Sequence, residues 1–164
     1  MCSSDLLTGH MVLSTLHTND AAGAVTRLLE MGVEEYLLPS CLMGVLAQRL
    51  VRTICDGCSG PREVPQALRE EVLRETGSFP EGDLRLGRGC EACAGTGYRG
   101  RSGIFELLPV TESVKGLILA RADSGAIRGK AVSEGMRLLR EDGWEKVRRG
   151  ITSIEEVLRA TRTG

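Results

Sequence analysis

Two Cys-x-x-Cys pairs constrain the fold of this chain more than any other feature of its sequence. Cys55 pairs with Cys58 and Cys90 with Cys93, and residues 59–89 separate the two pairs. A tight turn lets both sulfurs of a pair point at one ion, and Zn²⁺ is held by four such ligands in a tetrahedron. Glycines flank each pair and suit a tightly turned backbone. The spacing therefore predicts a structural zinc site with these four cysteines as ligands.

Two other uses of the cysteines stay open. The chain can keep the scaffold of a metal site without binding a metal tightly, or it can use a pair for thioredoxin-like redox chemistry. The redox use is the weaker alternative, since that motif belongs at a helix N-terminus after a strand.

Residues 90–97, CEACAGTG, also fit the zinc repeat of DnaJ-type co-chaperones. Those proteins contain several such repeats in a row, whereas only two pairs are present here, so this interpretation is rejected. Cys41, in an apolar stretch, is expected to be a buried small hydrophobe.

The composition narrows the function classes. The 164 residues carry a net charge of −1, with 41% hydrophobic and 26% charged residues, which is ordinary for a globular protein. This charge gives no basic field for nucleic acid or anionic lipid, and no apolar run reaches the roughly 18 residues of a membrane span. The first residues lack the pattern of a signal peptide. We therefore expect a cytoplasmic location, where paired cysteines favour metal binding over disulfides.

Hydrophobic periodicity predicts an α/β arrangement at the start of the chain. MVLSTL, residues 11–16, has the apolar, partly β-branched character of a buried strand. A helix capped by Thr18 or Asn19 follows and ends at Gly32, and a second helix is predicted over residues 35–50. A strand followed by helices is typical of an α/β layer rather than of an isolated zinc module.

The rest of the chain is predicted to combine short strands with amphipathic helices. Residues 65–76 should form a helix, and residues 103–110, GIFELLPV, a strand. Helices continue from Thr111, which caps the first of them, and Thr152 or Ser153 caps the last.

Both histidines of the chain flank the first predicted strand. His17 ends this strand, at the edge where α/β proteins place groups that meet ligands, and His10 comes just before it. Taken alone, each histidine is more often structural than catalytic.

Four segments resemble the secretion ATPase superfamily, the hexameric motors of type II secretion and type IV pilus assembly. In chain order they are TGHMVLSTLHTNDAAGAVTRLLEMGVEEYLL (8–38), AQRLVRTICDGC (47–58), CEACAGTGYRGRSGIFELLPVTE (90–112) and GMRLLREDGWEKVRRGITSIEEVLRAT (135–161). The resemblance covers residues 7–162 in one order. The tetracysteine element points to the secretion and pilus-extension branches of the superfamily.

The resemblance implies an α/β fold: the C-terminal half of a RecA-like P-loop ATPase core, with an inserted tetracysteine zinc subdomain and a C-terminal helical bundle. It divides the chain into three segments. Residues 1–52 would belong to the ATPase core, residues 53–104 would form the zinc subdomain, and residues 105–164 would form the C-terminal helical region.

The resemblance also implies roles for residues around the histidines. His17 and His10 would approach the nucleotide and sense its γ-phosphate, because an imidazole can donate a hydrogen bond to a phosphate oxygen. Arg49 would line a subunit interface, where a guanidinium suits phosphate or carboxylate, although a plain salt bridge explains it equally well. The polar residues expected to position the water or the histidine are Thr15, Thr18 and Asn19.

The implied activity is ATP hydrolysis with Mg²⁺ by a homo-hexamer at the cytoplasmic face of the inner membrane, which drives a membrane platform protein. The family's phosphate loop does not occur here. Residues 125–131, GAIRGKA, have too short a spacing and Ala131 lacks the hydroxyl that holds Mg²⁺, so a helical surface is expected. We therefore expect the chain to be a C-terminal fragment that does not hydrolyse ATP alone.

Two alternatives to this function stay open. One is a non-catalytic zinc module that binds nucleic acid, against which stand the balanced charge and an aromatic content of 3%. The other is a non-catalytic partner that enters rings of the complete ATPase.

Overall fold

The computed structural model describes residues 11–162. They divide into two compact units. Among the described residues, the helical unit comprises 11–47 together with Glu106–Leu138, and the cysteine unit comprises Gln48–Phe105 together with 139–162. These units are defined by spatial contacts, and each combines two stretches of the chain. The predicted division into three consecutive segments, 1–52, 53–104 and 105–164, stays a prediction.

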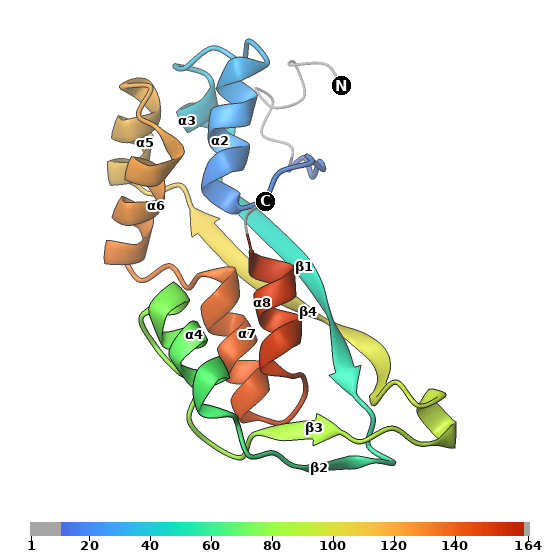
Figure 1. The fold of residues 1–164 in the computed structure, drawn as a ribbon. Coiled ribbons are helices and arrows are strands. Elements are labelled where there is room, and N and C mark those ends of the chain that lie inside the picture. Colours follow the sequence, from blue (N-terminus) through green and yellow to red (C-terminus); the bar gives the residue numbers. More distant parts are fainter. Residues whose placement is uncertain (1–10, 163–164) are drawn as a thin grey trace. The chain divides into compact units, whose positions relative to one another are not determined.

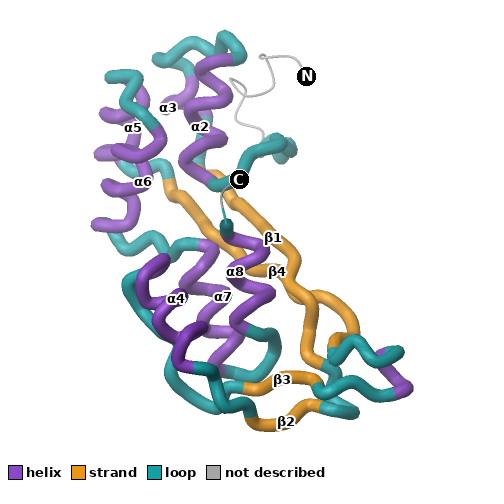
Figure 2. Tube along the Cα trace, viewed as in Figure 1, coloured by secondary structure: helices purple, strands orange, loops and turns teal. Residues whose placement is uncertain are grey.

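Two long paired strands, β1 (Gly44–Ile54) and β4 (Tyr98–Pro109), connect the elements described below. They run side by side in opposite directions (Figures 1 and 2), and the boundary between the two units falls within both of them. Burial alternates along the second half of β4, where Ile104 and Leu108 are buried. This period of two is the pattern of a sheet with one covered face.

The helical unit packs helices against the end of this strand pair. Its helices are α2 (Ala21–Glu30), α3 (Leu38–Cys41), α5 (Glu112–Leu119) and α6 (Ser124–Ser133). Apolar side chains at helical spacing meet in one core, to which α2 contributes Val25, α5 contributes Ile118 and α6 contributes Ile127.

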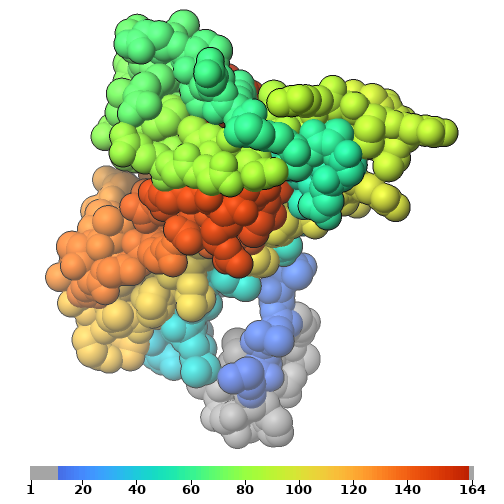
Figure 3. Space-filling view, turned by 90° about the horizontal axis from the view of Figure 1, so that it is seen from below, coloured from blue at the N-terminus to red at the C-terminus, as the bar shows by residue number. Residues whose placement is uncertain are grey.

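The cysteine unit joins a second, short sheet to three helices. Its elements are β2 (Ser59–Pro61), α4 (Gln66–Thr76), β3 (Arg85–Gly87), the 3₁₀-helix η1 (Glu91–Cys93), α7 (Leu139–Arg148) and α8 (Ile154–Thr161). The helices share an apolar core in which Val72 of α4 meets Trp144 of α7 and Val157 of α8, and Figure 3 shows α4 in green beside the red of the C-terminal helices. The segment around η1 projects at the edge of this unit (Figures 1 and 3).

Most predicted helices are confirmed. The helix over 65–76 is α4, and Thr111 caps α5 by accepting a hydrogen bond from the amide of Val114. GAIRGKA lies in α6, as a helix rather than a phosphate loop. Ser153 is the N-cap of α8.

Two predicted elements at the start of the chain are wrong. Residues 35–50 form the short α3 and then β1 instead of one helix. Leucines and valines occupy both faces of this stretch, so its sequence fits a period of 3.6 as well as a period of two. Pairing with β4, a contact distant in sequence, selects the strand and leaves Leu46 and Leu50 61% and 46% exposed.

Residues 11–16 form neither strand nor helix. A strand requires a neighbour for its backbone groups, and within residues 11–162 this segment pairs with none, leaving Met11 and Leu13 75% and 88% exposed. The N-cap of the helix that follows is Asp20 rather than Thr18 or Asn19, and it accepts a hydrogen bond from Gly23 N at 2.7 Å.

Candidate metal centre

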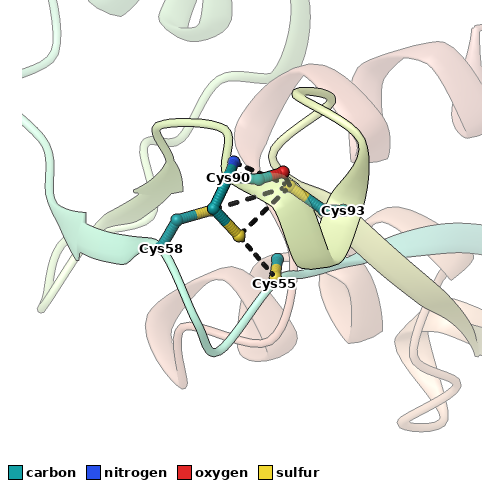
Figure 4. Close-up of side chains that lie close together, drawn as sticks. All are labelled: Cys55, Cys58, Cys90 and Cys93. Atoms are coloured by element: carbon teal, nitrogen blue, oxygen red, sulfur yellow. Dashed lines mark hydrogen bonds between the residues drawn. The ribbon is translucent and has the colours of Figure 1, made fainter.

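The first cysteine pair lies at the point where the chain leaves β1 and enters β2. Cys55 follows the last residue of β1 and Cys58 precedes the first residue of β2. Cys58 N donates to Cys55 O at 3.2 Å, which closes a tight turn and turns both side chains to one side (Figure 4).

The second pair lies on η1. Cys90 is its N-cap and Cys93 its last residue, and Cys93 N donates to Cys90 O at 3.2 Å, repeating the turn of the first pair. The Sγ atom of Cys93 accepts hydrogen bonds from the amides of Cys90 and Gly97, both at 3.2 Å. These amides favour a thiolate at this position.

Backbone hydrogen bonds lock the two turns together. The β2–β3 ladder pairs Ser59 with Gly87, which brings the chain back beside the first turn. Arg88 N then donates to Cys58 O at 3.1 Å, and Cys55 N donates to Gly97 O at 3.0 Å. Both cysteines of the first pair are thus bonded to the chain on either side of the second pair.

The four sulfurs form a compact cluster whose dimensions fit a tetrahedral metal site. All four Sγ atoms lie within 4.8 Å of one another. The Sγ atoms of Cys55 and Cys90 are 3.9 Å apart, those of Cys58 and Cys93 3.8 Å, and those of Cys90 and Cys93 3.7 Å. A tetrahedron with Zn–S bonds of about 2.3 Å has sulfur–sulfur edges of about 3.8 Å. The cysteines are free thiols, and the cluster can bind a metal ion.

The protonation of the sulfurs is uneven within the cluster. Backbone amides of Cys90 and Gly97 lower the pKa of Cys93 to about 6, against the opposing effect of its burial. Burial raises the pKa of Cys58 to about 11, and hydrogen bonds to the neighbouring thiols add to this. A divalent cation would remove this asymmetry, because metal ligation requires the thiolate form.

Two glycines allow the chain segments of the cluster to approach closely. A Cβ atom on Gly87 would lie 1.9 Å from the carbonyl oxygen of Gly97, and a Cβ atom on Gly97 would lie 2.4 Å from the carbonyl oxygen of Gly87. Gly97 also has a φ of +77°, a left-handed conformation that side chains disfavour.

The residues predicted around the nucleotide are distributed over both units. His17 and Thr15 are exposed, in the segment without helix or strand that precedes α2, and Asn19 is exposed next to them. The hydroxyl of Thr18 donates to the carbonyl of Asp20 at 3.2 Å. His10 lies outside the described residues, so its predicted role stays a prediction, as do those of the other four.

Arg49 is half-buried on β1 in the cysteine unit, and its predicted place at a subunit interface likewise stays a prediction. Cys41, expected to be buried, is half-buried at the end of α3.

Two buried carboxylates escaped the sequence analysis. Glu106, 3% exposed on β4, accepts a hydrogen bond from Ala21 N at 3.0 Å and so anchors the start of α2 just after His17. Glu156, 1% exposed on α8, binds Arg52 three residues before the first cysteine. In each case the partners are more than 80 residues apart in sequence, so no local pattern could have revealed them.

In the described part of the chain, none of the helices is long and apolar enough to cross a membrane. A model of the family described as type II/IV secretion system protein matches residues 1–159. The type IV pilus assembly ATPase PilB of Thermus thermophilus is 48% identical over 156 residues, which cover 94% of this chain and 17% of that protein. The type II secretion system ATPase E of Vibrio cholerae is 48% identical over 156 residues, covering 95% of this chain and 30% of that protein.

The type II secretion system protein E of Pseudomonas aeruginosa is 46% identical over 156 residues, again covering 95% of this chain and 30% of that protein. The chain thus spans less than a third of the length of these relatives. The family model covers nearly all of the chain, including the four cysteines. The chain therefore belongs to the type II/IV secretion system protein family.

Proposed function

We propose that the four cysteines bind one structural zinc ion. The observation that carries this proposal is the set of sulfur–sulfur distances, 3.7 to 3.9 Å for three pairs, which match the edges of a tetrahedral thiolate site. Zinc bound there would supply no catalytic chemistry but would hold the two turns together, because ligand binding and local folding are coupled.

Metal analysis of the chain, purified without chelator, tests this proposal. We expect about one zinc ion per chain in the wild type and in Cys41→Ser, and a loss of zinc in Cys93→Ser. Cys41 is the control, since it is also a free cysteine but lies outside the cluster of four. Cobalt substitution should give the intense thiolate-to-cobalt absorption of a tetrahedral site. Wild-type protein that contains no zinc would rule out the assignment.

The broader proposal is that this chain is part of an ATPase subunit that powers type II secretion or type IV pilus assembly. It is supported by identities of 46–48% to an ATPase of each machine and to a further secretion protein E. In that assembly the subunit would act as a homo-hexamer, cytoplasmic and peripheral at the inner membrane, and would work on the platform protein of the machine. ATP and Mg²⁺ would be its substrate and cofactor.

Within this proposal the 164 residues do not hydrolyse ATP by themselves. Their sequence holds no G-x-x-x-x-G-K-[ST] loop, and phosphoryl transfer depends on such a loop and on a Mg²⁺ carboxylate to stabilise the charge of the transition state. Those groups would come from the RecA-like core beyond these residues.

A turnover assay on the zinc-loaded chain tests the inactivity. We expect phosphate release at the level of a mock purification. The His17→Ala variant serves as the control for contaminating ATPases. Turnover above background that disappears in His17→Ala would show that the chain itself is an ATPase and would overturn the proposal.

The role proposed for His17 is to sense the γ-phosphate, with Thr15, Thr18 and Asn19 beside it. The exposure of His17 supports this role, because a ligand can reach an exposed side chain, and Glu106 anchors the helix that begins four residues later. In the longer protein, His17→Ala should slow ATP hydrolysis at least tenfold, as loss of a positioned hydrogen-bond donor does, without changing the zinc content.

A further inference from the structure

The start of α8 is hydrogen-bonded to the end of β1, just before the first cysteine of the cluster. Glu156 accepts hydrogen bonds from the backbone amide and from the guanidinium of Arg52, both at 2.8 Å. The carbonyl of the same arginine accepts a hydrogen bond from the Thr152 hydroxyl at 2.8 Å, and Ile54 N donates to Ile151 O at 2.9 Å. Two of the three residues before Cys55, Arg52 and Ile54, are thus bonded to residues 151–156.

The same helix start also holds the chain that follows the second cysteine pair. The Tyr98 hydroxyl and the Ser153 hydroxyl lie 2.7 Å apart, and the Arg52 guanidinium stacks over the Tyr98 ring at 4.3 Å from its centroid. Tyr98 comes directly after Gly97, whose amide donates to Cys93 Sγ and whose carbonyl accepts from Cys55 N. The start of α8 therefore contacts the chain just before the first cysteine turn and just after the second.

The carboxylate at the centre of these contacts is buried and strongly paired. Glu156 is 1% exposed, and Arg159 binds it alongside Arg52 with a contact of 2.8 Å. A carboxylate that accepts several charge-assisted hydrogen bonds is held in one geometry. Arg62, close to the first turn in sequence, reaches the neighbouring Glu155 at 2.7 Å.

We propose that the start of α8 is a positioning element for the metal centre: Glu156 and Ser153, which are not ligands, hold Arg52 and Tyr98 and so preorganise the four sulfurs for the ion. This inference rests on the proposed zinc site. It makes metal affinity depend on a helix that follows the last ligand by some sixty residues of chain. Residues that orient metal ligands change affinity by about 10- to 100-fold when they are altered.

The test measures zinc affinity by competition with a chromophoric chelator, at neutral pH and on protein shown to be folded by circular dichroism. Glu156→Gln keeps the shape of the side chain but removes the charge that holds both arginines, and we expect its zinc dissociation constant to rise about tenfold. Tyr98→Phe removes one hydroxyl and keeps the ring under Arg52, so its dissociation constant should rise roughly two- to tenfold. This second variant decides the question if Glu156→Gln does not fold.

A matched control separates positioning from general destabilisation. Val147, 2% exposed on α7 of the same unit, lies in its apolar core, so Val147→Ala should weaken folding and leave zinc affinity unchanged. Wild-type affinity in Glu156→Gln, or an equal loss in Val147→Ala, would overturn the inference. Failure of the wild type to bind zinc would instead overturn the zinc site, and the inference with it.

Discussion

At the scale of single residues, the close approach of Gly87 and Gly97 leaves no room for a side chain. Gly97→Ala would place a methyl group 2.4 Å from a backbone carbonyl oxygen, which cannot move without breaking the hydrogen bonds between the cysteine turns. We expect the variant to lose more than about 3 kcal/mol of unfolding free energy, from backbone strain and overpacking together. Urea unfolding of the zinc-loaded protein, followed by the fluorescence of Trp144, measures this loss.

Gly95→Ala is the control for that substitution. Gly95 has the same φ of +77°, but a Cβ atom there would meet nothing within 4 Å. It should therefore lose only the roughly 1–2 kcal/mol of left-handed backbone strain. Equal losses in the two variants would mean that the contact with Gly87 contributes nothing.

Glu156 gives the cysteine unit a specific dependence on pH. Burial raises the pKa of this carboxyl group, but hydrogen bonds from Arg159 and Arg52 outweigh burial and lower it from the usual 4.5 to about 2. Since the folded pKa lies below the unfolded one, the stabilisation is complete above about pH 4.5 and is lost as the pH falls toward 2. It amounts to at most about 3 kcal/mol, because both arginines are half-exposed and water screens them.

Urea unfolding between pH 6 and pH 2.5, in the presence of a chelator so that metal loss does not contribute, measures this dependence. The difference in stability between the wild type and Glu156→Gln should shrink as the pH falls. Glu145→Gln removes an exposed carboxylate paired with Arg148 on α7 and should keep the pH profile of the wild type. A constant difference between wild type and Glu156→Gln would contradict the assignment.

The spacing of the cysteines was enough to predict their cluster, but the residues that surround the cluster could not be predicted from the sequence. Each Cys-x-x-Cys pair is local, and the geometry of a tight turn follows from the sequence of that turn. Glu156 and Arg52 are 104 residues apart, and neither stands in a motif. A buried carboxylate can be recognised only after the fold brings its cations to it.

At the scale of elements, α7 and α8 pack so closely that one helical residue must be small. A Cβ atom on Gly143 would lie 2.6 Å from Cγ1 of Val157. Alanine has the higher helix propensity by about 1 kcal/mol, yet we expect Gly143→Ala to destabilise the protein by about 1–3 kcal/mol through overpacking. Thermal and urea unfolding give the sign directly.

Two further variants identify the cause of that loss. Gly129→Ala on α6 meets nothing within 4 Å, so it should gain stability or leave it unchanged. By itself, Val157→Ala should destabilise the protein by opening a cavity. The double variant with Gly143→Ala should lose less unfolding free energy than the sum of the two single losses. Strict additivity would show that the two side chains do not compete for the same space.

The elements that sequence reasoning missed are those defined by distant partners. Helices α4 and α5 follow from local periodicity and capping, as at Thr111. Strand β1 does not, because its apolar residues fit a helix equally well until β4 is beside it. Residues 11–16 have the composition of a strand, but composition cannot supply the neighbour that a strand requires.

At the scale of the whole molecule, residues 11–162 form two separate apolar cores, and the cysteine cluster belongs to only one of the two units. The core around Val25 and Ile118 lies in the helical unit, and the core around Trp144 and Val157 lies in the cysteine unit. Because the proposed ligands lie in the turn between β1 and β2 and at η1, within residues 48–105, metal binding should stabilise mainly that unit. The helical unit has its own core and does not need the ion to keep it.

Removal of zinc should therefore loosen one unit selectively. After treatment with a strong chelator, we expect amide hydrogen exchange to rise most in residues 54–61 and 85–98, where the hydrogen bonds between the cysteine turns lie. Exchange in α2, α5 and α6 should stay within experimental error, because local openings follow the cooperative units of a protein. Adding zinc back should restore the protection of these amides. Adding magnesium, the control ion, should not restore it, since Mg²⁺ prefers oxygen ligands. An equal rise in both units would mean that the two cores unfold as one, and that the cysteine cluster stabilises the entire chain rather than the unit that contains it.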